Sequence, residues 1–214
     1  MKTIYLNLKE NHDKNDIIKA GNALKNGDLV IFPTDTVYGL GAVYDNEQAI
    51  SKIFNIKNRN LNKPLNVLIS DISMLDLLAK NISQDHLNLM SAFWPGPLTI
   101  ILDKKETVLD IITSGLSTIG IRIPNNNIAL DLIKCVGKPI VTTSANLSGD
   151  SSSVDATHSL NIFNNKVSYI LDGGESSLKL DSTIVHMNKD KPEILRNGSI
   201  SLNDINLVLE KERI

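Results

Sequence analysis

The chain has 214 residues, of which 42% are hydrophobic and 21% are charged, and its formal net charge is −2 at pH 7. These values are ordinary for a soluble globular protein, and the small net charge argues against a protein that binds polyanions over its whole surface. The opening residues MKTIYLNLKE carry no apolar signal core, and no apolar run reaches roughly 18 residues, so we expect neither a signal peptide nor a membrane span. The lone cysteine, Cys135, rules out a disulfide within the chain and favours the reducing cytoplasm, and we expect it to be a small buried thiol.

Short apolar runs rich in β-branched residues alternate with amphipathic stretches along the chain. The apolar runs predict strands at 3–8, 28–32, 65–70, 98–103, 118–123, 139–143, 167–172, 182–187 and 192–196. Spacings of three and four predict helices at 16–26, 47–57, 71–80, 83–93, 128–136 and 202–209. Gly27 is expected to end the first helix and Ser201 to cap the last. This order predicts an α/β or α+β fold with a central sheet, and we expect residues 1–214 to form one domain.

The arginines stand out because the chain otherwise uses lysine for positive charge. Of 22 Lys and Arg residues only four are arginines, and three of these lie in motif-like blocks: IKNR (Arg59), IGIRIP (Arg122) and EILRNG (Arg196). A guanidinium can grip a carboxylate or phosphate with two parallel hydrogen bonds, which lysine cannot do. The pattern favours an anion-binding site, although ordinary ion pairs would use the same residues.

Three polar blocks follow predicted secondary structure. FPTDTVYGLGAVY (32–44) places Thr34, Asp35 and Thr36 at the end of a strand, where ligands commonly bind, or where hydroxyls simply cap a turn. If the chain is extended after the helix at 47–57, Lys57 and Arg59 point the same way and form a positive patch with nearby Lys63.

The third block, TTSAN (142–146), offers uncharged hydroxyls and an amide that either cradle a ligand or cap a helix. The four histidines are scattered without the spacing of zinc ligands, so we expect no resident metal. A phosphate-binding GxxxxGK[ST] loop is also absent from the sequence.

Taken in order, the blocks resemble those of the YrdC-like family of threonylcarbamoyl-AMP synthases. The matching segments are PTDTVYGLGA (33–42), KNR and KPL (57–65), WPGPLT (94–99), GIRIP (120–124), TSANLSG (143–149), LDGG (171–174), DSTIV (181–185) and ILRNG (194–198). The resemblance implies a twisted mixed β-sheet flanked by helices around a positively charged cavity. It implies a nucleotidyltransferase that makes threonylcarbamoyl-AMP and pyrophosphate from L-threonine, bicarbonate and ATP, for N6-threonylcarbamoyladenosine formation on tRNA.

The resemblance also implies roles for individual residues. The catalytic cations would be Lys57 and Arg59. The threonine site would comprise Thr36, Arg122, Thr142 and Ser182. The ATP site would comprise Arg59, Lys63, Ile119, Ser144, Asn146, Ser152 and Arg196. We expect Mg²⁺ to arrive with ATP, and the product to pass to a tRNA threonylcarbamoyl transferase.

The chain departs from the family pattern at three positions, Asn60, Leu68 and Asn197, which bear on affinity rather than activity. The alternative function is a non-catalytic module of the same fold that binds tRNA or double-stranded RNA, and weak binding of this kind is also compatible with a synthase. The RNA-binding module is disfavoured because affinity for a nucleic-acid backbone needs many dispersed cations, whereas the distinctive cations of this chain lie in a few blocks. The polar segment 148–153 is expected to be a mobile loop that folds over bound nucleotide.

Overall fold

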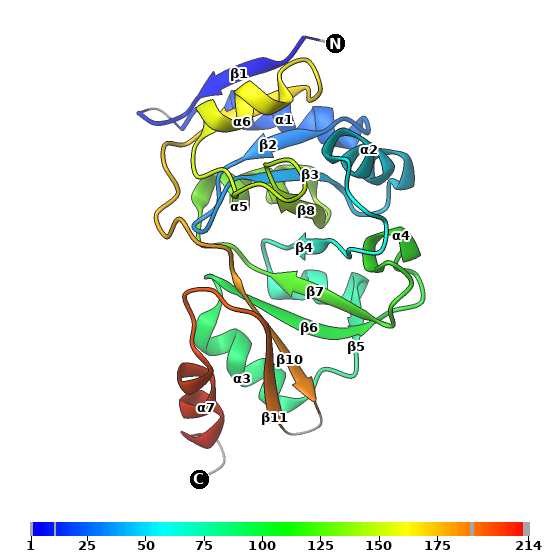
Figure 1. Cartoon of the computed structure of the whole chain (residues 1–214), viewed down its shortest axis with the longest axis vertical. Coiled ribbons are helices and arrows are strands. Elements are labelled where there is room, and N and C mark those ends of the chain that lie inside the picture. Colours follow the sequence, from blue (N-terminus) through cyan, green and yellow to red (C-terminus); the bar gives the residue numbers. More distant parts are fainter. Residues whose placement is uncertain (1, 11, 189–190, 212–214) are drawn as a thin grey trace.

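The computed structural model describes residues 2–10, 12–188 and 191–211, and the fourth arginine, Arg213, lies outside them. The described strands pair into one mixed sheet, in the order β1-β9-β2-β3-β8-β4-β7-β6-β10-β11, with β5 paired to β6 (Figure 1). The strands are β1 (Ile4–Asn7), β2 (Val30–Phe32), β3 (Gly39–Val43), β4 (Asn66–Leu68), β5 (Ala79–Lys80), β6 (Leu98–Lys104), β7 (Thr118–Arg122), β8 (Ile140–Ser144), β9 (Tyr169–Asp172), β10 (Thr183–Asn188) and β11 (Lys191–Arg196). The predicted twisted mixed sheet flanked by helices is confirmed.

Helices cover both faces of this sheet. They are α1 (Lys14–Lys25), α2 (Glu47–Lys57), the 3₁₀ helix η1 (Ile72–Leu77), α3 (Gln84–Phe93), α4 (Asp110–Thr113), α5 (Asn127–Val136), α6 (Ala156–Phe163) and α7 (Leu202–Lys211). Alternate residues of a strand point to opposite faces, so Val30 and Phe32 of β2 pack with α1 and α5, whereas Ile31 packs into the larger core with α2 and α6. Among the described helices, none is long and apolar enough to cross a membrane.

The predicted helix ends are confirmed where a cap was recognised. Gly27 has φ +82°, a left-handed conformation that suits the residue after the end of α1. At the start of α7, the N–H of Asp204 donates to Ser201 Oγ at 3.2 Å, and the N–H of Ser201 donates to Asp204 Oδ2 at 2.9 Å. Cys135 is half-buried rather than fully buried as expected, and its Sγ lies over Gly21 where α1 and α5 pack together.

Four elements differ from the sequence prediction. The helix predicted at 71–80 is instead η1 followed by the two-residue strand β5. Strand β3 was not predicted because it contains Gly39 and Gly41, which are weak strand formers. A Cβ at Gly39 would come within 2.7 Å of Thr142 Oγ1, so the neighbouring side chains leave no space for a larger residue. Helices α4 and α6 were also not predicted.

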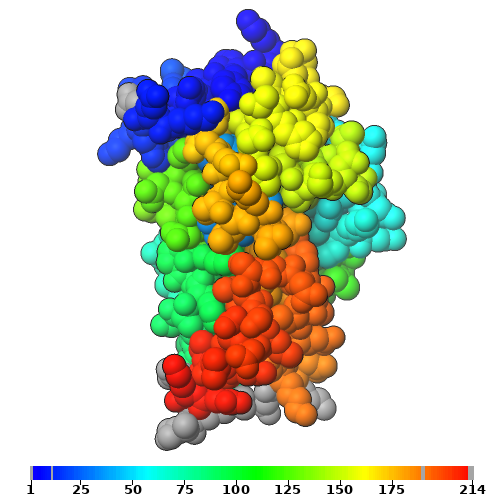
Figure 2. Space-filling view, turned by 60° about the vertical axis from the view of Figure 1, so that its left-hand side comes forward, coloured from blue at the N-terminus to red at the C-terminus, as the bar shows by residue number. Residues whose placement is uncertain are grey.

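One connection brings two of the motif blocks together. The segment 173–182 leaves β9 and runs down the surface to β10, as the orange band in Figure 2 shows. It is fastened to the turn after β2, where the N–H of Leu178 donates to the carbonyl of Asp35 at 3.0 Å and Ser177 Oγ donates to the same carbonyl at 3.1 Å. The DSTIV block therefore begins beside the PTDT block, far from it in sequence.

Candidate active site

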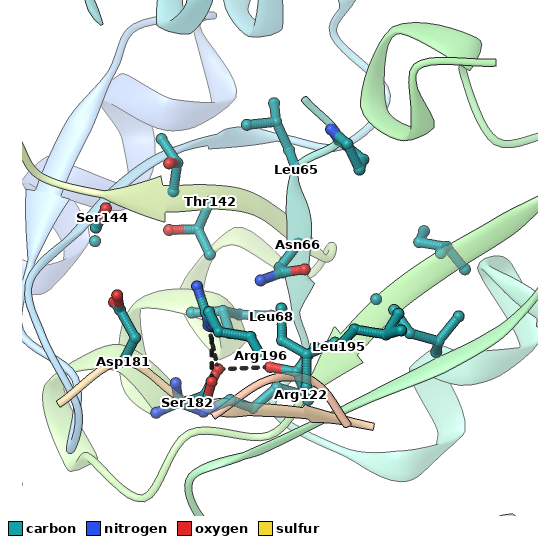
Figure 3. A pocket seen from close by; sticks show the side chains of 18 of the residues that line it. Leu65, Asn66, Leu68, Arg122, Thr142, Ser144, Asp181, Ser182, Leu195 and Arg196 are labelled. Carbon is teal, nitrogen blue, oxygen red and sulfur yellow. Dashed lines mark hydrogen bonds between the residues drawn. The ribbon is translucent and has the colours of Figure 1, made fainter. Parts of the chain in front are cut away.

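A cavity of about 400 Å³ is built on β4, β6, β7, β8, β10 and β11 (Figure 3). The period of two explains its lining: Thr99 and Ile101 of β6 face the cavity, whereas Ile100 between them faces the core. Of the predicted site residues, eight line this cavity: Thr36, Arg59, Ile119, Arg122, Thr142, Ser144, Ser182 and Arg196. Its volume is in the range of small-molecule sites, so the sequence blocks meet at a space that fits a ligand.

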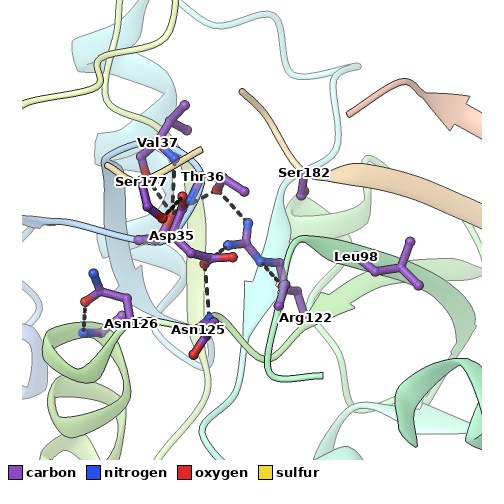
Figure 4. Close-up of polar contacts among 12 residues, drawn as sticks. Asp35, Thr36, Val37, Leu98, Arg122, Asn125, Asn126, Ser177 and Ser182 are labelled. Atoms are coloured by element: carbon purple, nitrogen blue, oxygen red, sulfur yellow. Dashed lines mark hydrogen bonds and ion pairs between the residues drawn. The ribbon is translucent and has the colours of Figure 1, made fainter. Parts of the chain in front are cut away.

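Arg122 is the buried centre of one end of the cavity (Figure 4). Its Nε donates to the carbonyl of Gly96 at 2.9 Å, its Nη1 donates to Thr36 Oγ1 at 2.8 Å, and its Nη2 forms an ion pair with Asp35. Asp35 Oδ1 also accepts the N–H of Asn125 at 3.1 Å. Burial lowers the pKa of Arg122, and the Asp35 carboxylate opposes that lowering.

These contacts leave Arg122 only partly available to a ligand. Three of its five N–H groups are engaged by protein oxygens. One N–H on each terminal nitrogen remains for a ligand. The motif residue Asp35 supplies the balancing charge, a role that the sequence alone did not identify.

Arg196 and Ser182 form another part of the wall. Arg196 reaches back from β11 to β10, where its Nε donates to the Ser182 carbonyl at 2.9 Å and its Nη2 donates to Ser182 Oγ at 2.8 Å (Figure 3). Ser182 Oγ also lies 2.8 Å from Thr99 Oγ1. Burial lowers the pKa of Arg196, and Asp181 opposes that change.

Arg59 adds a second cation to this wall. Its guanidinium donates to two carbonyls of its own loop, that of Lys63 at 3.2 Å and that of Pro64 at 2.8 Å. Burial lowers the pKa of Arg59, and the positive charge of Arg196 lowers it further. Two guanidiniums that line the same cavity and repel each other would be stabilised by an anion between them.

Lys57 occupies a different place from the one predicted. The chain is not extended after α2, because Asn58 has φ 49° and caps the helix, so Lys57 and Arg59 do not form one extended face. Lys57 is 1% exposed and is not among the described residues that line the cavity. Its ammonium donates to the carbonyls of Ser144 and Asn146, and thereby fastens the loop after β8 to the end of α2.

The burial of Lys57 has a consequence for stability. Burial lowers the pKa of Lys57 from 10.5 to about 7, and the charge of Arg59 adds to this lowering. Between pH 7 and 10 the unfolded chain therefore binds more protons than the folded chain, and the free energy of unfolding should rise with pH by at most about 1.4 kcal/mol per pH unit. Urea unfolding at pH 7, 8 and 9 should show this slope in wild type and not in Lys57→Met. The control Lys63→Met, an exposed lysine, should keep the slope; an identical slope in Lys57→Met would contradict the assignment.

The end of β8 presents Thr142 and Ser144 to the cavity, with Asn146 behind them. Ser144 Oγ donates to Asn146 Oδ1, and the Asn146 amide nitrogen donates to the carbonyls of Leu147 at 2.9 Å and Asp150 at 2.7 Å. The Asn146 side chain is buried, and its hydrogen bonds hold the loop after β8 in place. The structure thus places Ser144 on the cavity and gives Asn146 a supporting position.

Two further predicted ATP residues also lie off the lining. Lys63 is exposed, and its carbonyl accepts a hydrogen bond from Arg59 Nε. Ser152 Oγ donates to Asp181 at 3.1 Å, and Asp181 lines the cavity. Within the segment 148–153, which is expected to be a mobile loop, Ser153 is fully buried and its carbonyl accepts the N–H of Tyr38 at 2.8 Å. Only 148–151 is exposed.

Several lining residues were missed by the sequence interpretation. Asn66 of β4 and Gly120 of β7 form part of the wall, and a Cβ at Gly120 would approach Asn66 Oδ1 to 2.5 Å. The glycine in GIRIP therefore leaves space for a polar side chain on the neighbouring strand. His186 and Asp181 also line the cavity. The period-two alternation of β10, which places Ser182, Ile184 and His186 on one face, was the available signal.

Comparison with known proteins assigns this chain to a family. The Sua5_yciO_yrdC family model, described as Telomere recombination, matches residues 22–198, and the chain belongs to this family. It is 40% identical over 212 residues to the threonylcarbamoyl-AMP synthase of Pyrococcus abyssi, covering 99% of this chain and 62% of that protein. It is also 40% identical over 194 residues to the threonylcarbamoyl-AMP synthase of Bacillus subtilis, covering 90% of this chain and 56% of that protein.

A solved structure has the same fold. The crystal structure of Pyrococcus abyssi Sua5 complexed with L-threonine matches with a TM-score of 0.93 and 40% identity, over 96% of this chain and 60% of that one. The chain therefore spans less than two thirds of the length of these relatives.

Proposed function

We propose that this chain is an L-threonylcarbamoyladenylate synthase, a nucleotidyltransferase that uses L-threonine, bicarbonate and ATP. The observation that carries the proposal is a single cavity with Arg122, Thr36 and Ser182 on its walls and the guanidiniums of Arg59 and Arg196 beside them. One part has hydroxyls and a buried cation for an amino acid, and the other has cations for phosphates. The relatives named threonylcarbamoyl-AMP synthase support this assignment.

The proposed chemistry follows from these charges. The threonine amine and bicarbonate form a carbamate with loss of water. A carbamate oxygen then attacks the α-phosphorus of ATP, and the bond from that phosphorus to the bridging oxygen breaks to release pyrophosphate. Arg59 and Arg196 would stabilise the charge that grows on the phosphate oxygens, and the buried Arg122 would hold the threonine carboxylate through its remaining N–H groups.

Mg²⁺ would neutralise phosphate charge and would come with ATP. Among the described residues that line the cavity, the only carboxylate is Asp181, and no cluster of three or more metal-ligating side chains occurs in the described part of the chain. This donor set fits an ion held mainly by phosphate oxygens and water. We further propose that residues 1–214 act as one catalytic domain in the cytoplasm, and that the product passes to a tRNA threonylcarbamoyl transferase.

A pyrophosphate-release assay tests the proposal. With ATP, Mg²⁺ and bicarbonate present, pyrophosphate is expected only when L-threonine is added, because the carbamate nucleophile cannot form without the amine. Binding of tRNA that weakens steeply with salt, without threonine-dependent pyrophosphate, would support the RNA-binding module instead.

A further inference from the structure

Asp181 has an unusual position in this cavity. It is the only acidic residue among the described residues that line it, and the other charged lining residues are the cations Arg59, Arg122 and Arg196. Asp181 is the next-to-last residue of the segment 173–182 and directly precedes Ser182. Figure 3 shows its carboxylate oxygens pointing toward the end of β8 at Ser144.

The Asp181 carboxylate is oriented but not neutralised. Ser152 Oγ lies 3.1 Å and 3.3 Å from its two oxygens, and no lysine or arginine nitrogen in the described part of the chain lies within 4.0 Å of it. Its charge nevertheless acts on the site. Burial lowers the pKa of Lys57, Arg122 and Arg196, and Asp181 opposes the lowering in each case.

A carboxylate in this position disfavours the binding of the anionic ligands proposed for this cavity. ATP, bicarbonate and the threonine carboxylate are all anionic, so Asp181 would repel each of them. Threonine brings one cation, its α-ammonium group, which carries three hydrogen-bond donors. The Asp181 carboxylate, which has no cationic partner within 4.0 Å in the described part of the chain, provides the acceptor that this group needs, and charge-assisted bonds of this kind are strong.

We propose that Asp181 receives the α-ammonium group of the amino-acid substrate, while Arg122 receives its carboxylate. This inference rests on the proposed function. The amino acid would then lie across Ser182 with its two charged groups matched to residues of opposite sign. Asp181 becomes a specificity-determining residue, because a site built to bind an ammonium group rejects a ligand that lacks it.

The test compares two ligands by isothermal titration calorimetry. L-threonine and (R)-3-hydroxybutanoate have the same carboxylate, hydroxyl and methyl groups, but the second lacks the ammonium. Wild type should bind threonine at least about tenfold more tightly. Asp181→Asn keeps an oxygen for Ser152; it should bind threonine about tenfold more weakly and the hydroxybutanoate no less tightly than wild type does, because the repulsion is gone.

The matched control is Asp150→Asn, which removes the same charge from the exposed loop beside the site. It should leave the preference for threonine at the wild-type value. Melting temperatures of all three proteins should agree, which would show that the change in preference is not caused by unfolding.

The remaining outcomes are also decisive. If Asp181→Asn keeps the full preference for threonine, or alters only the Mg²⁺ dependence of ATP binding, Asp181 is not the ammonium receptor. If Asp150→Asn loses the preference equally, the effect is one of net charge and the inference is again wrong. If wild type binds neither ligand but Asp181→Asn is folded, the proposed function fails as well.

Discussion

Replacing Arg122 with alanine is expected to lower the free energy of unfolding by about 3–5 kcal/mol, because it leaves the Asp35 carboxylate buried without its partner. Asp35 is 5% exposed, and its second oxygen, Oδ2, already has no hydrogen-bond partner in the described part of the chain. Urea unfolding at pH 7 measures the effect. The double variant Asp35→Asn/Arg122→Ala should recover part of the loss, because no buried charge remains.

Arg122→Lys separates stability from binding. Lysine keeps the charge opposite Asp35 but cannot contact Thr36, Gly96 and a ligand carboxylate in one plane. We expect a raised KM for threonine with a nearly unchanged KM for ATP. Wild-type stability in Arg122→Ala, or an unchanged threonine dependence in Arg122→Lys, would contradict the role given to this residue.

Arg196→Ala should reduce kcat by roughly a hundredfold or more while costing little stability. The change removes a hydrogen-bond donor that would stabilise the charge developing on the phosphate oxygens. Its bonds to Ser182 join two adjacent strands that the backbone ladder already holds. Steady-state kinetics and thermal unfolding measure the two quantities. Lys191→Ala, an exposed cation at the start of the same strand, is the control and should be fully active. Full activity of Arg196→Ala would show that the Arg196 guanidinium does not contribute to catalysis.

Much of the fold could be predicted because most strands are short apolar runs bounded by Pro, Gly or Asp. The failures have local causes. In α6 the buried residues are Ala156, Ser159 and Phe163, of which only the phenylalanine is a large apolar residue, so the helical period is hard to recognise. In β3 the glycines that weaken the strand pattern are required by the side chains of neighbouring strands.

The site was predicted where motif residues reach the cavity directly, and incompletely where a tertiary partner changes what a side chain does. Arg122 and Asp35 are 87 residues apart, and their ion pair depends on how β7 and the turn after β2 meet. Lys57 was expected to be a catalytic cation beside Arg59, but the left-handed Asn58 turns the chain and carbonyls of the loop after β8 accept hydrogen bonds from the Lys57 ammonium. Such pairings follow from the assembled sheet and are not encoded in the spacing of residues.

The most direct test of the proposed activity is to follow the carbon of bicarbonate into the product. The purified chain is incubated with ATP, Mg²⁺, L-threonine and ¹³C-bicarbonate. The nucleotides are then separated, and their masses are measured by mass spectrometry. The account predicts threonylcarbamoyl-AMP that carries one ¹³C atom, in an amount equal to the pyrophosphate released. Pyrophosphate or AMP formed without labelled adenylate, or no turnover by a folded protein that binds both threonine and ATP, would contradict it.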